Sequence, residues 1–104
     1  MFLPHGMALS RESIESIALR RSYTVFKRGA DPDAVITMLY TELLLTQEEK
    51  GRAMQRTLTA DRQLDVVFEC LEKRVSADPS VFHKLVKMLL ENPALKAVGN
   101  KMQG

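Results

Sequence analysis

The segment from Thr59 to Arg74 constrains the fold more than any other part of the sequence, because its apolar residues recur with the period of a helix. The residues that share this apolar face are Leu64, Val67, Phe68, Leu71 and Val75. A strand would need strict alternation, which the run Val66-Val67-Phe68 breaks. Thr59 suits an N-cap, and the basic residues near Arg74 suit a last turn. We predict a helix, the fourth in the chain, that buries this face in a core and exposes Val66 on the opposite side.

Length and charge limit the kinds of protein that this chain can be. A chain of 104 residues supports one hydrophobic core. Its 15 basic and 13 acidic residues leave a net charge of +2, too small to indicate nucleic acid or a membrane as partner. A single cysteine excludes an internal disulfide and fits a reducing, cytoplasmic location. Residues 1–9 lack the pattern of a secretory signal, and we expect a flexible leader there and one domain over 10–104.

Helix-start signals predict five further helices. The first begins at Ser10 and runs to Arg28, with Gly29 just beyond its end. Its apolar stripe rotates after Leu19, which predicts a bend or burial against two neighbours. Asp31-Pro32 opens the second helix, with Leu43 facing inward near its end. The capping box from Thr46 to Glu49 opens the third, a short helix.

The C-terminal third of the chain repeats the cap-plus-proline signal twice. Asp78-Pro79 opens a fifth helix that is apolar on almost every side. Asn92-Pro93 opens a short sixth helix that ends at Gly99 or slightly beyond. Short connections between helices favour antiparallel neighbours. The predicted fold class is therefore all-α, a six-helix antiparallel bundle.

Four segments in this order resemble the caspase-recruitment domain, one branch of the death-fold superfamily. The resemblance extends from Ile17 to Val98. It rests on these segments: Phe26-Lys27-Arg28 followed by Asp33-Ala34-Val35-Ile36-Thr37-Met38-Leu39; Leu44-Leu45-Thr46-Gln47-Glu48-Glu49; Thr59 to Arg74; and Val81-Phe82, Leu85-Val86 and Leu89 with Asn92-Pro93-Ala94-Leu95. The sequence departs from the family at two positions. Glu42 replaces the small or glycine residue common before the second segment, and Val75 stands where a glycine often ends the fourth helix.

This resemblance implies a Greek-key bundle of the death-fold type with a bent first helix. It also implies a non-enzymatic adaptor that binds other domains of its own fold, itself included, in cell-death or innate-immune signalling. Because the first and fourth helices of that fold lie opposite the second and third, the resemblance implies two oppositely charged faces. Such head-to-tail surfaces build helical filaments when the rotation does not close.

The charged residues of this chain divide accordingly. The predicted partner-binding basic face, on the first and fourth helices, consists of Arg20, Arg21, Lys27, Arg28, Arg62 and Lys73. The predicted acidic face consists of Asp31, Asp33, Glu42, Glu48 and Glu49. Val66 is a possible apolar contact beside the basic face, although a lone exposed valine is also ordinary. For any single charged residue, a solvated surface position worth about 0–1 kcal/mol is the simpler interpretation.

Catalysis and cofactor binding have no support in the sequence. Cys70 lies beside the apolar stripe and is most simply a half-buried hydrophobe. His5 falls in the leader, and His83 is expected at a surface or interface. Two histidines and one cysteine at these spacings match no zinc pattern, and there is no glycine-rich phosphate loop. We expect no catalytic residue, no metal, no cofactor and no small-molecule substrate.

Three alternatives remain. The chain is also compatible with another death-fold subfamily, namely the death, death-effector or pyrin domains. A small helical nucleic-acid-binding domain is a second alternative, although Asp61, Asp65 and Glu69 on the fourth helix would meet phosphate. The third is a structural or regulatory piece of a longer protein that has no homotypic partner.

Overall fold

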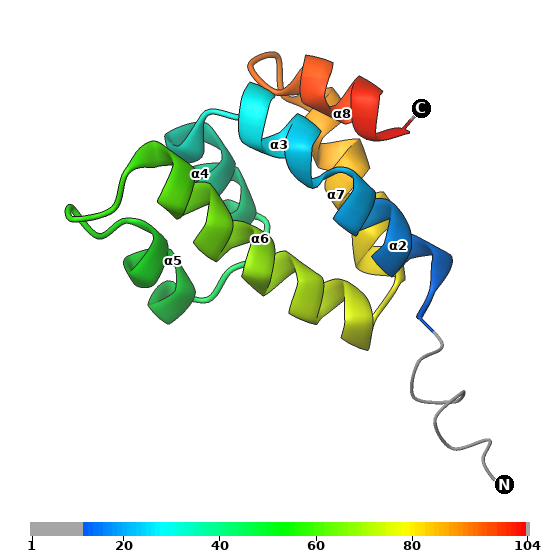
Figure 1. Cartoon of the computed structure of the whole chain (residues 1–104), viewed down its shortest axis with the longest axis horizontal. Helices are drawn as coiled ribbons and strands as arrows, with labels where there is room; N and C mark the ends of the chain where they lie inside the picture. The colour runs from blue at the N-terminus through cyan, green and yellow to red at the C-terminus, as the bar shows by residue number, and fades with distance from the viewer. Residues whose placement is uncertain (1–11, 104) are drawn as a thin grey trace, which may run out of the picture.

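The computed structural model describes residues 12–103 and contains only helices there, with no strand (Figure 1). The helices are α2 (Ile14–Arg21), α3 (Tyr23–Gly29), α4 (Pro32–Thr41), α5 (Gln47–Ala53), α6 (Ala60–Ala77), α7 (Ser80–Glu91) and α8 (Lys96–Gln103). The all-α prediction is confirmed. The leader predicted for residues 1–9 and the helix start predicted at Ser10 lie outside the described residues.

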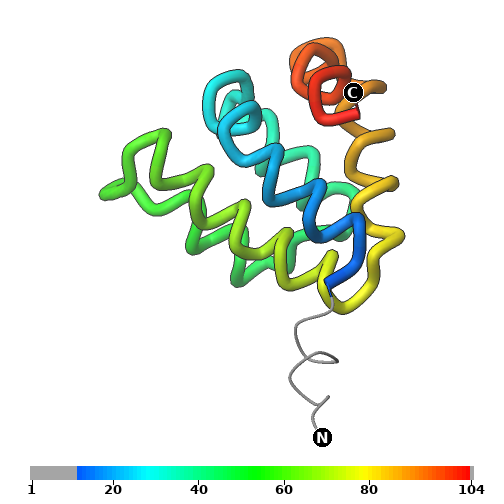
Figure 2. The backbone as a smooth tube through the Cα atoms, turned by 45° about the vertical axis from the view of Figure 1, so that its right-hand side comes forward, coloured from blue at the N-terminus to red at the C-terminus, as the bar shows by residue number. Residues whose placement is uncertain are grey.

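The α6 helix is the longest element and lies between the other helices (Figures 1 and 2). Thr59 caps it as predicted, because its hydroxyl accepts a hydrogen bond of 3.2 Å from the Arg62 N–H. The predicted apolar stripe is buried, and α6 packs against α2, α3, α4, α5 and α7. The helix continues to Ala77, three residues beyond its predicted end at Arg74.

The predicted first helix is divided at Ser22 into α2 and α3. The Ser22 hydroxyl donates a 2.8 Å hydrogen bond back to the Ala18 carbonyl, a contact that bends helices. The two parts then meet different neighbours: α2 packs against α6 and α7, and α3 against α6 and α8. This explains the rotating stripe. The residue that caps α2 is Ser13, and Ile14 and Ile17 are exposed, so the first part of the stripe contributes little to the core.

The prediction that Leu43 faces inward is wrong. Leu43 follows the C-cap of α4 with a φ of 65° and is 83% exposed, whereas Leu44 and Leu45 are buried. The N–H groups of Leu43 and Leu44 donate to the carbonyls of Tyr40 (3.1 Å) and Leu39 (2.8 Å), which is the Schellman pattern. Its left-handed position normally belongs to glycine and costs another residue about 1 kcal/mol. Leu43, and not Glu42 with its φ of −90°, therefore occupies the glycine-favouring site.

The starts of α4 and α5 follow the local signals in the sequence, whereas other helix boundaries differ from the prediction. Asp31 caps α4, and both hydrogen bonds of the capping box from Thr46 to Glu49 are present at α5. The predicted start of the last helix at Asn92-Pro93 is wrong, because α8 begins at Lys96. It also continues to Gln103 and buries Met102, so it ends later than the predicted position at or slightly beyond Gly99. Gly29, predicted to lie just beyond the first helix, is instead the last residue of α3.

No helix in residues 12–103 has the length and apolar character needed to cross a membrane.

Candidate interaction surfaces

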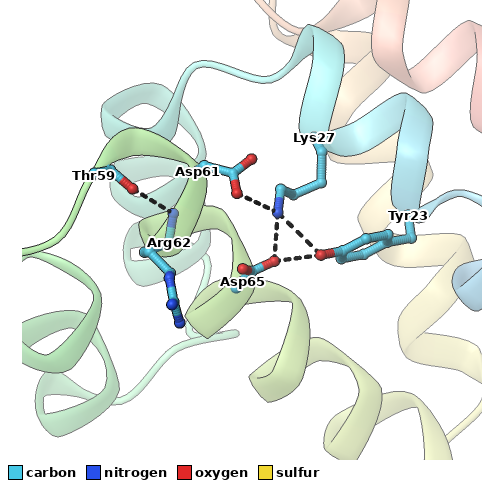
Figure 3. A network of polar contacts seen from close by, with 6 residues as sticks. All are labelled: Tyr23, Lys27, Thr59, Asp61, Arg62 and Asp65. Atoms are coloured by element: carbon cyan, nitrogen blue, oxygen red, sulfur yellow. Dashed lines mark hydrogen bonds and ion pairs between the residues drawn. The ribbon is translucent and has the colours of Figure 1, made fainter.

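Lys27 lies in a polar cluster between α3 and α6 (Figure 3). Its Nζ lies 2.6 Å from Asp65 Oδ1, 3.0 Å from Asp61 Oδ2 and 3.0 Å from the Tyr23 hydroxyl, which donates to the same Asp65 oxygen at 2.6 Å. Only 13% of the Lys27 side chain is exposed. Hydrogen bonding to Asp65 raises the pKa of Lys27, and the same bond, helped by Tyr23, lowers the pKa of Asp65. This predicted member of the basic face thus joins two helices of its own chain.

The other predicted basic residues are more accessible. Arg20 is exposed and forms an ion pair with Glu12, which raises the pKa of Arg20. In contrast, four cations are exposed and form no ion pair with any residue among 12–103: Arg21, Arg28, Arg62 and Lys73. The Arg62 side chain points away from the Lys27 cluster (Figure 3). These four residues are the part of the predicted basic face that is available to a partner.

The acidic residues of α4 line a common groove. Asp31, Asp33 and Glu42 border an open groove of about 570 Å³ with Ala34 and Met38, which we call the acidic groove. The Asp31 carboxylate also accepts the Ala34 N–H at 3.0 Å, so it holds the start of α4 in place. Asp33 and Glu42 are exposed and have no ion-pair partner among the described residues. They give this groove a negative charge that is available to a partner.

The two acidic residues of α5 have different environments. Glu48 is exposed, whereas the Glu49 side chain is 19% exposed and lies 2.7 Å from the Arg74 guanidinium of α6. Burial raises the pKa of Glu49, but the Thr46 N–H and Arg74 outweigh it, so the pKa is lowered. Glu49 therefore joins α5 to α6 within the chain, and Glu48 is the more accessible of the two.

Val66 and Cys70 are more buried than the sequence analysis expected. Val66 was predicted to be exposed, but it is partly buried and packs against the core. Cys70 is 2% exposed, and burial, followed by the nearby Glu49 carboxylate, raises the pKa of its thiol. A buried thiol with a raised pKa is a poor nucleophile.

The remaining titratable groups form no metal site in the described range. His83 is exposed, and its Nε2 lies 2.9 Å from Glu15 of α2. Among residues 12–103, no group of three or more histidine, cysteine, aspartate or glutamate side chains has a geometry that holds a metal ion. His5 lies outside this range.

A second concave site was not predicted from the sequence. It lies between α3 and α8, has a volume of about 210 Å³, and we call it the α3–α8 pocket. Val25, Ala97 and Val98 supply apolar walls, and the exposed residues Arg28 and Lys101 supply positive charge. Because its two sides lie some seventy residues apart in the sequence, no local pattern brings them together.

Comparisons of the chain with protein-family models, with curated proteins and with solved structures found no match.

Proposed function

We propose that this chain is a non-enzymatic adaptor module of the caspase-recruitment type. It binds domains of its own death-type, six-segment helical fold, including further copies of itself, in cytoplasmic cell-death or innate-immune signalling. The acidic groove of one domain receives exposed arginine and lysine side chains of α2, α3 or α6 of the next. The partner is a protein of the same fold, with no cofactor, substrate or nucleic acid involved.

The acidic groove is the observation that carries this proposal. Three of the acidic residues named from the sequence, Asp31, Asp33 and Glu42, border one concavity with an apolar component from Ala34 and Met38. A concave apolar surface with a charged border resembles the centre and rim of a protein interface. Unpaired cations on other helices of the same chain supply the opposite charge, which favours specificity and rapid association.

The helical arrangement supports the same proposal. When α2 and α3, divided at Ser22, are taken as two parts of one bent helix, five further helices follow in the described range, and this count supports the proposal. The long α6 helix contacts both parts of that bent segment as well as α4, α5 and α7. Arg62 of α6 and Arg21 of α2 are both exposed in this arrangement.

A charge-reversal experiment tests the proposal. Arg20 and Lys27 are less suitable positions, because both are already paired within the chain and the largely buried Lys27 also joins α3 to α6. We therefore choose Asp33→Lys in the acidic groove and Arg62→Glu on α6, since both side chains are exposed and neither forms an ion pair in the described range. Each variant should remain a folded monomer and lose self-association, and an equimolar mixture of the two should recover it. Lys87→Glu, an exposed position on α7, is the control.

The readout is sedimentation velocity at low and high salt, with circular dichroism to establish folding. Association of the wild type should weaken as salt increases, because exposed charges are screened. If both folded variants associate as the wild type does at low salt, the charged surfaces named here do not form the contact. If the Lys87→Glu control loses association to the same extent, the effect belongs to net charge and the assignment is likewise wrong.

A further inference from the structure

Leu43 combines backbone strain with exposure. It holds a left-handed conformation, with a φ of 65°, at a position that favours glycine. Its side chain is 83% exposed, so contacts within the chain do not offset the cost of that conformation. Glu42 precedes it and is also exposed. The connection between α4 and α5 therefore presents an isobutyl group to solvent beside a carboxylate, and strain of this kind is concentrated at functional sites.

The α3–α8 pocket is complementary to Leu43 and Glu42 in shape and in charge. Its walls at Val25, Ala97 and Val98 are apolar, and Arg28 and Lys101 add positive charge at its exposed side. The volume of about 210 Å³ exceeds that of an apolar cavity of about 150 Å³ that accommodates benzene. A leucine side chain therefore fits. Leu43 of the same chain does not fill the pocket, because that side chain remains exposed to solvent.

We propose that Leu43 of one copy inserts into the α3–α8 pocket of a second copy, where Glu42 meets Arg28 and Lys101. Shape and charge both match: an apolar side chain beside an acidic residue enters an apolar pocket beside two basic residues. This inference rests on the proposed function, because it specifies one contact through which copies of the chain associate.

The contact is heterologous, since the protruding residue and the pocket belong to different elements. Figures 1 and 2 show α8 at the top of the molecule and the connection from α4 to α5 lower down. Each copy therefore keeps one unused Leu43 or one unused pocket after it has bound a neighbour. A contact of this type extends into a chain of molecules unless the rotation closes a ring.

Replacement of the leucine separates binding from folding. Leu43→Gly relieves the left-handed strain, so the variant should be at least as stable as the wild type in thermal unfolding. It should nevertheless self-associate about 10- to 100-fold more weakly, because the buried leucine is lost from the contact. Met54→Ala is the control, since Met54 is an exposed apolar residue at the end of α5 and lies outside both surfaces. Its association should match the wild type.

Replacement on the pocket side tests the second half of the contact. Lys101→Glu should weaken association, and Lys96→Glu should not, because Lys96 lies on the same helix but outside the pocket. Mixing Glu42→Lys with Lys101→Glu should restore association across the contact that joins the two changed residues. Sedimentation velocity at low salt provides the readout for every arm.

The outcomes distinguish this inference from the proposed function. If Leu43→Gly associates as the wild type does, while Asp33→Lys and Arg62→Glu do not, the homotypic function stands and the Leu43 contact is wrong. If Met54→Ala weakens association as much as Leu43→Gly, the specific role of Leu43 is also wrong. If the wild type remains a monomer under every condition, both proposals fail.

Discussion

The C-terminal ends of α3 and α4 differ in which one carries a glycine and which one needs a left-handed residue. The α3 helix ends in Gly29, which has no positive φ, whereas α4 is followed by Leu43 in the left-handed conformation. Glycine normally serves the second purpose, because it lacks the Cβ atom that opposes a positive φ. The glycine is therefore present at the helix end that does not need its backbone freedom.

Space around each residue explains the difference. A Cβ atom on Gly29 would lie 2.9 Å from Cγ2 of Val98, so the absence of a side chain lets α3 approach α8 closely. At Leu43, solvent surrounds the side chain and the neighbouring residues Leu44 and Leu45 are buried. The end of α3 is thus determined by close packing against α8. The end of α4 is determined by the need to direct Leu44 and Leu45 into the core while Leu43 remains outside.

Among these substitutions, Gly29→Ala should change the stability of the fold the most. We expect it to destabilise the fold by about 1–2 kcal/mol, because overpacking against the stiff Val98 side chain outweighs the better helix propensity of alanine. Denaturant unfolding measures the change. Gly51→Ala is the matched control, since nothing lies within 4 Å of a Cβ there, and it should stabilise the protein. Equal stabilisation by both substitutions would refute the packing explanation for Gly29.

Leu43→Gly should act in the opposite direction and more weakly. We expect a stabilisation of about 0.5–1 kcal/mol, because relief of the left-handed strain exceeds the extra backbone entropy that glycine loses on folding. Glu42→Gly, at a neighbouring residue with a φ of −90°, should destabilise the protein instead. Thermal unfolding of the two variants gives the comparison. A loss of stability in Leu43→Gly would show that the leucine has a packing role that its exposure does not suggest.

The smallest expected effect comes from a substitution in the Lys27 cluster, at Asp65, and it is a change in the pH dependence of stability. The hydrogen bond from Lys27 lowers the pKa of folded Asp65 below its unfolded value of about 3.9. Its contribution is therefore complete above the unfolded pKa and disappears as the pH falls through the folded pKa. Asp65→Asn should weaken the fold at neutral pH and reduce the loss of stability between neutral and acidic pH.

Denaturant unfolding at several pH values measures that loss. Asp33→Asn is the control, because Asp33 is exposed and has no ion-pair partner in the described range. A parallel pH dependence in wild type and Asp65→Asn would mean that the ionisation of Asp65 contributes nothing to the pH dependence of stability.

Sequence reasoning succeeded where a signal is local. The Asp31-Pro32 start, the capping box at Thr46 and the Thr59 cap each involve residues within one turn, and all are present. The apolar stripe of α6 depends only on helical period. The division at Ser22 was also indicated by the sequence. Each part of the first helix packs against different neighbours, and the apolar stripe rotates accordingly.

Sequence reasoning failed where a residue's environment depends on residues that are distant in the sequence. The run Leu43-Leu44-Leu45 contains three identical side chains, and periodicity alone does not identify the one that remains outside. The pairing of Lys27 with Asp65 joins residues 38 positions apart, and the α3–α8 pocket joins residues still farther apart. For the same reason, the predicted basic face included Lys27, although its charge is satisfied within the chain.

Sedimentation velocity of the wild type over a concentration series at low and at high salt tests the central claim most directly. A homotypic module with opposite charges on different helices should form assemblies that grow with concentration and shrink as salt is added. A monomer of constant sedimentation coefficient at every concentration in low salt would contradict the claim that this chain associates with its own fold.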